Sequence, residues 1–447
     1  MTKRKMVHYQ RLATSEKSSA GSGSTSRRRT ASSSEMTSQK KCMLVSGFLV
    51  TITFLAGFLY NTMQEHVYAI VIDAGSTGTR LNAFNFRKSL LTGNYELSND
   101  LFVEIKPGLS SFADDPKKGA ATIVELLSHS KLQLVIPPSE WANTPLALKA
   151  TAGLRLLPEK QANAILDEVR SVLSDLPFYT NENSVSIMEG VDEGIFSWFT
   201  INFLSNSLGG SVKDTAAAID MGGGSTQITF AAEQSSSLWQ TSRKFLHPVT
   251  AFHQNLTVYT HSYLGMGLMA ARKAILSVGN PEGSTVLKSA CMHPIMKKPW
   301  TYNRITYTVQ GLDNSEGISH VKESACKELV QSYIKGKIDK PDELKHHSKI
   351  NTISYFFDRA TEFGLIDPFE GGRVQVKSFK DAAAISCRNP NADQPFMCLD
   401  MLFIHTLLSE DGFGLKENSY LDLYKKIDNH ELSWALGAAF HILQNGV

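Results

Sequence analysis

The chain has 447 residues, of which 42% are hydrophobic and 20% are charged, an ordinary globular composition with room for two domains. Its net charge of +2 at pH 7 is unevenly distributed, because residues 1–41 hold ten Lys or Arg and two Glu, which leaves −6 for the remainder. This balance excludes a protein that binds nucleic acid along a basic stripe, so we expect no nucleic-acid partner.

The N-terminal part predicts a tail followed by a membrane segment. Residues 1–42 are basic and rich in Ser, Thr and Gly, so we expect a disordered tail. Residues 43–60 carry no charge and would measure about 27 Å as a helix, enough for a thin bilayer. We expect a transmembrane signal-anchor here; a signal-peptide core and a buried helix are the alternatives.

The charges that flank the apolar stretch predict its orientation. Lys40 and Lys41 directly precede it, and basic flanks stay in the cytosol. The tail would then be cytosolic and the large C-terminal part lumenal, as in a single-pass type II protein of the secretory pathway. Asn255 begins the chain's only glycosylation sequon and lies on that predicted lumenal side.

Four cysteines lie in the predicted lumenal part, which is an even number that suits two disulfides in an oxidising compartment. They are Cys291, Cys326, Cys387 and Cys398. Three pairings are possible, and local loop closure favours Cys291 with Cys326 and Cys387 with Cys398. None of the four has the two-residue spacing of zinc sites, so we do not expect a cysteine metal centre.

One pattern occurs twice, 147 residues apart: an apolar run that ends in Asp73 or Asp220, followed by a Gly-Ser-Thr turn. Each run predicts a buried strand, and each turn a tight hairpin whose backbone N–H groups can face an anion. Two unrelated structural hairpins are the alternative. The residues that we expect to bind phosphate are Ser76, Thr77, Gly78, Thr79, Arg80, Gly222, Gly223 and Gly224.

The surrounding pattern predicts an α/β fold. A strand should begin near Tyr68, with residues 80–86 as its hairpin partner and 101–106 as a third strand. Apolar residues at helical spacing between 162 and 173, with Pro158 at the first turn, predict a helix. Strands that alternate with helices favour two related lobes whose Asp hairpins face each other across a cleft. The chain has no P-loop lysine motif, so a nucleotide would have to bind through these hairpins.

Carboxylates supply the remaining predicted chemistry. Asp73 and Asp220 at opposed strand ends can hold Mg²⁺ or Ca²⁺, directly or through water; the alternative is that each caps its own turn. For the base that activates a water we choose Glu193, at a predicted strand-to-helix turn. The alternative for Glu193 is a carboxylate that only favours the helix dipole.

Five segments resemble, in order, the five apyrase conserved regions of the nucleoside triphosphate diphosphohydrolase family. They are DAGSTGTR (73–80), KATAGLR (149–155), EGVDEG (189–194), DMGGGSTQ (220–227) and SWALGA (433–438). The resemblance implies an α/β, two-lobed actin-like (ribonuclease H-like) fold with the active-site cleft between the lobes. Lobe I would comprise residues 66–188 and 430–447, and lobe II residues 189–429. It also implies metal-dependent removal of the terminal phosphate from nucleoside di- or triphosphates.

The resemblance further implies residue roles. Glu193 would be the general base, and Ser225 and Gln227 would position the water. Asp73 and Asp220 would hold the metal through water. Thr151, Arg155 and Trp434 would line the site. Tyr355 matches the position whose ring stacks on the base.

Within the family, we expect the chain to resemble most the secretory-pathway nucleoside diphosphatases, because the sequence ends soon after the Trp434 motif without a second membrane span. This implies hydrolysis of UDP, GDP or IDP to the monophosphate and phosphate in the Golgi or endoplasmic reticulum, in support of glycosyltransferases but without a stable partner. The anchor would be retained or clipped. The alternatives are an exopolyphosphatase-like hydrolase, which shares the 220–226 turn, and a nucleotide-gated binding module without turnover.

Overall fold

The computed structural model describes residues 38–446 except 234–235, 252–253, 313–316, 318 and 390. The predicted disordered tail lies outside the described residues, apart from residues 38–42, which begin helix α1 (Ser38–Thr62). The chain divides into two compact units, residues 1–62 and residues 63–447.

Helix α1 contains residues 43–60, which we predicted to span a membrane. Within the described part of the chain, no helix has both the length and the apolar character that a membrane span needs. The predicted membrane segment is therefore not supported by this finding.

The second unit begins with a five-stranded sheet of order β3-β2-β1-β4-β5. Its strands are β1 (Gln64–Ala74), β2 (Thr79–Ser89), β3 (Tyr95–Ile105), β4 (Leu146–Ala150) and β5 (Val185–Ile187). β1 pairs antiparallel with β2 and β2 with β3, whereas β1, β4 and β5 run parallel. The three strands that we predicted near Tyr68, at 80–86 and at 101–106 are thus confirmed, with longer bounds.

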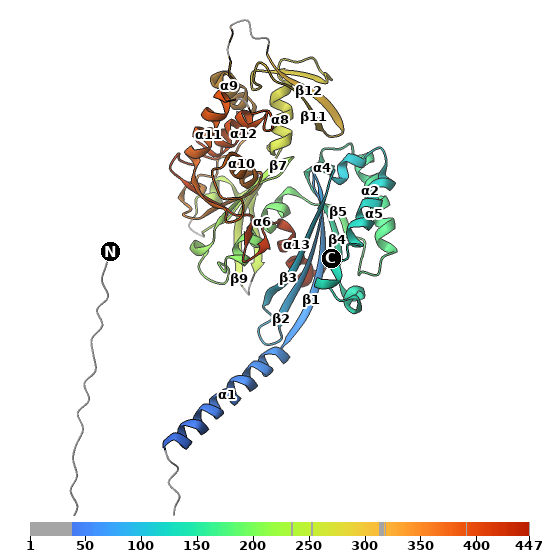
Figure 1. Ribbon diagram of the computed structural model, residues 1–447, viewed down its shortest axis with the longest axis vertical. Helices are drawn as coiled ribbons and strands as arrows, with labels where there is room; N and C mark the ends of the chain where they lie inside the picture. Colours follow the sequence, from blue (N-terminus) through green and yellow to red (C-terminus); the bar gives the residue numbers. More distant parts are fainter. Residues whose placement is uncertain are drawn as a thin grey trace, which may run out of the picture. The chain divides into compact units, whose positions relative to one another are not determined.

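Helices α2 (Pro116–Leu127), α3 (Leu132–Val135), α4 (Ala152–Arg155) and α5 (Glu159–Ser174) accompany this sheet (Figure 1). α5 is the helix that we predicted between 162 and 173, and Pro158 is its N-cap residue. Its buried face shares a core with β1 and β4, because its apolar residues recur at the spacing of one helix face.

A seven-stranded sheet of order β14-β15-β13-β6-β7-β9-β8 forms the other half of this unit. Its strands are β6 (Ala217–Met221), β7 (Ser225–Ala231), β8 (Leu246–Ala251), β9 (Gln254–Leu264), β13 (Ile350–Ser354), β14 (Gly372–Gln375) and β15 (Tyr420–Leu423). β6 pairs antiparallel with β7 and β7 with β9, whereas β6, β13 and β15 run parallel. The strands β9-β7-β6-β13-β15 therefore have the same order and the same relative directions as β3-β2-β1-β4-β5 in the first sheet. The duplication seen in the two Asp motifs thus extends to five strands of each sheet.

The α-helices from α7 to α12 share one buried cluster with the second sheet. The α-helices are α7 (Leu238–Thr241), α8 (Leu268–Ser277), α9 (Glu323–Ile334), α10 (Tyr355–Phe363), α11 (Val376–Arg388) and α12 (Met397–Leu408). A small sheet contains β10 (Val286–Ser289), β11 (Lys297–Tyr302) and β12 (Ile305–Gly311), and a hairpin contains β16 (Lys426–Ile427) and β17 (His430–Glu431). Short 3-10 helices occur at Leu109–Phe112, Pro138–Asn143, Val212–Asp214, Arg243–Phe245 and Leu344–His346.

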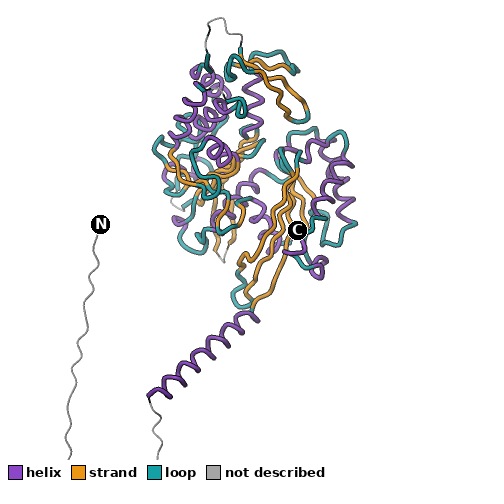
Figure 2. The backbone as a smooth tube through the Cα atoms, in the orientation of Figure 1, coloured by secondary structure: helices purple, strands orange, loops and turns teal. Residues whose placement is uncertain are grey.

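Two helices lie between the sheets and join the lobes, α6 (Gly190–Leu204) and α13 (Trp434–Asn445) (Figure 2). One buried cluster contains residues of α6, α13, β1, β6 and β9. Thr200 donates to the carbonyl of Ser433 (2.8 Å) and accepts from the N–H of Gly437 (3.0 Å). The chain therefore has the predicted two-lobed, actin-like α/β fold. The predicted lobe limits, at 188/189 and 429/430, stay a prediction.

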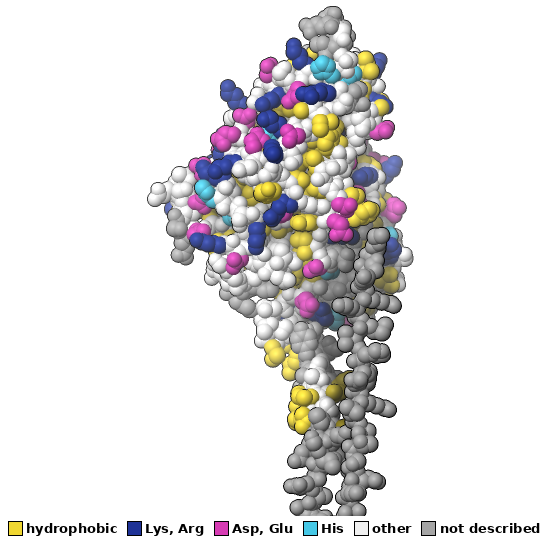
Figure 3. Space-filling view, turned by 60° about the vertical axis from the view of Figure 1, so that its left-hand side comes forward, with side chains coloured by type: hydrophobic (Ala, Val, Ile, Leu, Met, Phe, Trp, Pro, Cys, Tyr) yellow, Lys and Arg dark blue, Asp and Glu magenta, His cyan; other side chains and the backbone are white. Residues whose placement is uncertain are grey.

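Both predicted disulfides are present, Cys291–Cys326 and Cys387–Cys398. The second joins α11 to α12. Asn255 is exposed on β9 and accepts a hydrogen bond from Thr250 (2.9 Å), so its glycosylation stays a prediction. On the face shown in Figure 3, basic and acidic side chains are interspersed.

Candidate active site

A pocket of about 490 Å³ is lined by residues of both sheets and both Asp hairpins. Thirteen residues of the predicted site line it: Asp73, Ser76, Thr77, Arg80, Thr151, Glu193, Asp220, Gly222, Gly223, Gly224, Ser225, Tyr355 and Trp434. Residues from six separate sequence segments thus meet in one place. Gly78, Thr79, Arg155 and Gln227 are not among the lining residues.

The hairpins approach each other so closely that glycine is required at their tips. A Cβ at Gly223 would lie 2.4 Å from Oγ of Ser76, and a Cβ at Gly224 would lie 2.7 Å from Cβ of Ala152. A Cβ at Gly153 would similarly lie 2.8 Å from Cα of Ser76. The two hairpins and α4 therefore pack so closely that a side chain at any of these three glycines would clash.

The backbone of the second hairpin is held from outside. The N–H of Gly222 donates to the carbonyl of Ser225 (2.9 Å), which closes the turn. The N–H groups of Leu268 and Met269, at the start of α8, donate to the carbonyls of Gly222 and Gly223 (3.0 Å each). The N–H of Gly222 is thus committed to the turn rather than free for a phosphate.

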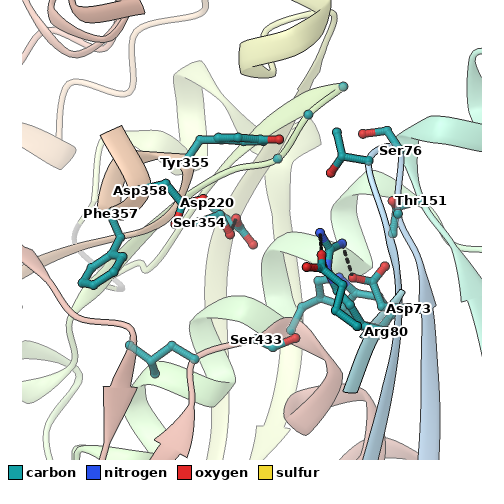
Figure 4. Close-up of a pocket in the computed structure, with 18 of the residues that line it drawn as sticks. Asp73, Ser76, Arg80, Thr151, Asp220, Ser354, Tyr355, Phe357, Asp358 and Ser433 are labelled. Atoms are coloured by element: carbon teal, nitrogen blue, oxygen red, sulfur yellow. Dashed lines mark hydrogen bonds and ion pairs between the residues drawn. The ribbon is translucent and has the colours of Figure 1, made fainter. Parts of the chain in front are cut away.

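Asp73 is buried at the end of β1 and is held by one oxygen only. Arg80 donates to its Oδ2 (3.1 Å), whereas Oδ1 has no hydrogen-bond partner in the structure. Burial raises the pKa of Asp73, and the charge of Arg80 opposes that rise. Figure 4 shows Arg80 and Asp73 side by side at the pocket.

Asp220 is buried at the end of β6 and has both oxygens hydrogen-bonded. Ser197 donates to Oδ2 and Ser354 to Oδ1, each at 2.7 Å. Burial raises the pKa of Asp220, while these two hydrogen bonds lower it. Ser354 has a φ of +61°, which is strained for a non-glycine residue; this conformation occurs where β13 passes into α10.

The two carboxylates suit a hydrated divalent cation. Both line the same pocket, and the buried Oδ1 of Asp73 lacks a partner that a cation or its water would supply. Among the described residues, no group of three or more His, Cys, Asp or Glu forms a ready metal cage. A cation here would depend on water and substrate oxygens for most of its coordination.

Glu193 lies in the first turn of α6 and is 7% exposed. Arg155 (2.5 Å) and Gln227 (3.0 Å) both donate to its Oε2. Burial raises the pKa of Glu193 to about 8, although the charge of Arg155 lowers it. The neighbouring carboxylates Glu189 and Asp192 are exposed and do not line the pocket, which leaves Glu193 as the carboxylate of this turn that faces the site.

Gln227 connects the base to the second hairpin. Its Nε2 donates to Oγ of Ser225 (2.9 Å) and to Oγ of Ser262 (3.1 Å) as well as to Glu193. Its side chain is 1% exposed, so it acts on the pocket through these partners. A water held near Ser225 would lie beside the base.

The sequence of residues 60–446 matches the model of the GDA1/CD39 (nucleoside phosphatase) family. The chain belongs to this family. It is 41% identical over 390 residues to the human protein named Nucleoside diphosphate phosphatase ENTPD5, covering 86% of this chain and 89% of the relative. It is 40% identical over 389 residues to mouse ectonucleoside triphosphate diphosphohydrolase 6, covering 86% and 83%.

A solved structure of nucleoside triphosphate hydrolases from Neospora caninum aligns with a TM-score of 0.59 over 90% of this chain and 97% of that chain, at 13% identity. At that identity the likeness supports the fold alone. Membership in the GDA1/CD39 family makes this chain a hydrolase, and the predicted family resemblance is confirmed.

Two predicted phosphate-binding residues, Thr79 and Arg80, have hydrogen-bond partners within the protein. Thr79 is fully buried, and its hydroxyl accepts the N–H of Leu109 (3.0 Å). Arg80 lines the pocket but is bound to Asp73 and to Glu104. Both residues therefore support the hairpin in this structure, and their phosphate binding stays a prediction.

Tyr355 is the first residue of α10 and lines the pocket on the side opposite Ser76 and Thr151 (Figure 4). Phe357, Asp358, Arg359 and Glu362 of the same helix also line it. Trp434 begins α13, is 5% exposed, and forms part of the wall. Tyr355 and Trp434 thus line the same pocket as the two Asp hairpins, and base stacking on Tyr355 stays a prediction.

Sequence reasoning missed several supporting side chains of this GDA1/CD39 family site: Ser197, Ser354, Ser262 and Glu104. Each hydrogen-bonds a predicted residue but stands outside the segments that hold the hairpins. Of the four, only Ser354 directly precedes a predicted site residue, Tyr355.

Proposed function

We propose that the protein hydrolyses nucleoside diphosphates of the UDP, GDP or IDP class to a nucleoside monophosphate and phosphate, with Mg²⁺ or Ca²⁺ as cofactor. The observation that carries this proposal is the meeting of Glu193 with both Asp hairpins in one pocket. The name of the human relative, a nucleoside diphosphate phosphatase, supports the choice of substrate.

The geometry of Glu193 supports its role as the base. Both of its hydrogen bonds are made by Oε2, so among the described residues Oε1 receives none and is left to accept a proton. A base with a pKa of about 8 is well matched to deprotonating water near neutral pH. Arg155 and Gln227 fix the carboxylate so that Oε1 keeps one direction.

The chemical step is direct hydrolysis. The water oxygen forms a bond to the terminal phosphorus, its proton passes to Oε1 of Glu193, and the bond from that phosphorus to the bridging oxygen breaks. The monophosphate leaves with the bridging oxygen. A cation held by Asp73 and Asp220 would neutralise charge on the phosphate oxygens, and Ser76, Thr77 and the second hairpin would bind the terminal phosphate.

Phosphate release by the purified protein tests this function. UDP, GDP, IDP, ADP, UTP and long-chain polyphosphate are each assayed with and without Mg²⁺ or Ca²⁺. We expect cation-dependent release from nucleoside diphosphates that Glu193→Gln abolishes and Glu189→Gln, the exposed carboxylate four residues earlier, leaves intact. Release from polyphosphate alone would favour the exopolyphosphatase alternative, and nucleotide binding without release would favour a binding module.

We also propose that the folded unit acts in the lumen of the Golgi or endoplasmic reticulum and removes nucleoside diphosphates that glycosyltransferases produce. The two disulfides support an oxidising compartment. Protease protection of a C-terminal epitope tag in intact microsomes tests this placement. A tag that is digested without detergent would contradict it.

A further inference from the structure

The register of the first sheet aligns three charged residues that line the pocket. Asp73 of β1 is directly opposite Arg80 of β2, and Arg80 is directly opposite Glu104 of β3. Directly opposite residues share one face of a sheet. The three side chains therefore form a row across the strands, with Arg80 between two carboxylates.

The second sheet has an equivalent row. Asp220 of β6 is directly opposite Gln227 of β7, and Gln227 is directly opposite Ser262 of β9. Because β9-β7-β6 repeats β3-β2-β1 in order and direction, Ser262 occupies the place that Glu104 occupies in the first sheet. The first two residues of each row belong to the Asp motifs, whereas Glu104 and Ser262 belong to none.

Glu104 determines how Arg80 meets Asp73. The Nε and NH2 groups of Arg80 both approach Oε1 of Glu104, at 3.0 and 2.9 Å, which leaves NH1 to donate to Oδ2 of Asp73. A guanidinium otherwise pairs readily with both oxygens of a carboxylate. Held by Glu104, Arg80 contacts one oxygen, and Oδ1 of Asp73 remains without a partner.

Ser262 acts on Gln227 in the corresponding way. Its hydroxyl accepts from Nε2 of Gln227, the atom that also donates to Ser225 and to the base Glu193. The backbone of Gly190 lies against it, because a Cβ there would be 2.2 Å from Oγ of Ser262. The hydroxyl is thus fixed between β9 and the start of α6, and it fixes the plane of the amide.

We propose that Glu104 and Ser262 are positioning residues at equivalent places of the two lobes, Glu104 for the cation carboxylate through Arg80 and Ser262 for the base through Gln227. This inference rests on the proposed function. Residues that hydrogen-bond the metal ligands or the catalytic side chains, and so orient them, commonly have a large effect on metal affinity or activity. The two residues should consequently affect different steps.

Glu104→Gln tests the first half. The variant removes the charge that holds Arg80, so Arg80 pairs with both oxygens of Asp73 and competes with the cation. We expect Mg²⁺ affinity to fall about tenfold, measured by isothermal titration calorimetry in the presence of a methylene-bridged nucleoside diphosphate, with kcat recovered at saturating Mg²⁺. The matched control is Glu96→Gln, which breaks another cross-strand pair of β3 with β2, Glu96 with Arg87 (2.8 Å), away from the pocket.

Ser262→Ala tests the second half. We expect kcat to fall about tenfold while KM and Mg²⁺ affinity stay within about twofold. The control is Thr260→Val, which removes a buried hydroxyl from the same strand by breaking its bond to Thr229 (2.7 Å). In a double-mutant cycle, Ser262→Ala should add no further loss of kcat to Gln227→Ala, since Ser262 acts only through that amide.

Several results would overturn the inference. Unchanged Mg²⁺ affinity in Glu104→Gln refutes the first half, whether or not the variant is less stable. Additive losses in the Ser262 and Gln227 cycle refute the second half, because a purely structural residue would weaken either background equally. A wild-type protein that binds Mg²⁺ and the analogue but releases no phosphate would contradict the proposed function, while the calorimetry would still decide the role of Glu104.

Discussion

At the residue scale, the site combines three buried carboxylates with few charges that neutralise them. Burial raises the pKa of each of Asp73, Glu193 and Asp220. Buried, ionised carboxylates destabilise the protein when no cation is bound. Their raised pKa values favour the binding of a cation and the acceptance of a proton. The same residues should therefore affect both stability and activity.

Glu193→Gln should lower activity and raise stability at the same time. The folded pKa of about 8 lies above the usual value of 4.5, so the stabilising contribution of the protonated form is complete below pH 4.5 and is lost as pH rises through 8. We expect activity to fall by about 10²-fold or more. Thermal melting should show the variant more stable than wild type at pH 8, with the difference vanishing toward pH 5. A variant less stable at pH 8 would contradict the raised pKa.

Arg155→Gln should shift the pH dependence of the rate. The charge of Arg155 lowers the pKa of Glu193, so its removal raises that pKa further and leaves less ionised base at pH 7. We expect kcat/KM at pH 7 to fall about tenfold and to recover as pH increases. The control is Arg170→Gln, an exposed arginine of α5 that pairs with Asp167. An unshifted pH profile would contradict this electrostatic role.

At the element scale, the active site depends on how closely two hairpin turns approach each other. Gly223→Ala places a Cβ 2.4 Å from Oγ of Ser76 and 3.0 Å from Thr77. We expect the hairpins to separate and KM for the nucleotide to rise about tenfold or more. At Gly222 a Cβ would meet nothing closer than 3.5 Å, so Gly222→Ala should have a much smaller effect. Equal effects at both positions would show that the turn itself, not the approach, is sensitive.

The hairpins and the base were predictable because their signals are local. An apolar run that ends in Asp before a glycine turn defines β1 and β6, and a carboxylate at a strand-to-helix turn defines the place of Glu193 at the start of α6. Their partners were not predictable, because strand register and helix packing bring Ser197, Glu104 and Ser262 to the site from separate segments. The short sheet of β10, β11 and β12 was also not predicted, because no clear hydrophobic periodicity marks its strands and the loops between them.

Thr79 shows the limit of motif reasoning within an element. It follows the Gly-Ser-Thr turn as the first residue of β2, and its side chain is buried in the core, where its hydroxyl accepts the N–H of Leu109. The motif identifies the residue types, and the pleat of β2 decides which of them face the core.

At the scale of the whole molecule, the two lobes are joined by the crossing of α6 and α13. The crossing packs Gly437 directly on α6, because a Cβ there would lie 2.5 Å from the carbonyl oxygen of Phe196. Both helices also carry pocket residues, Glu193 on α6 and Trp434 on α13. The packing that joins the lobes is therefore the packing that places the base.

Gly437→Ala should consequently impair stability and catalysis together. Overpacking at a helix crossing costs about 1–3 kcal/mol, so we expect a melting temperature lower by several degrees. Because α6 has to move to admit the methyl group, Glu193 shifts with it, and kcat should fall even at temperatures where the variant is fully folded. Gln444→Ala, an exposed position of the same helix, should change neither quantity. A Gly437→Ala protein that melts earlier but retains full kcat when folded would show that the helix crossing stabilises the lobes without setting the position of the base.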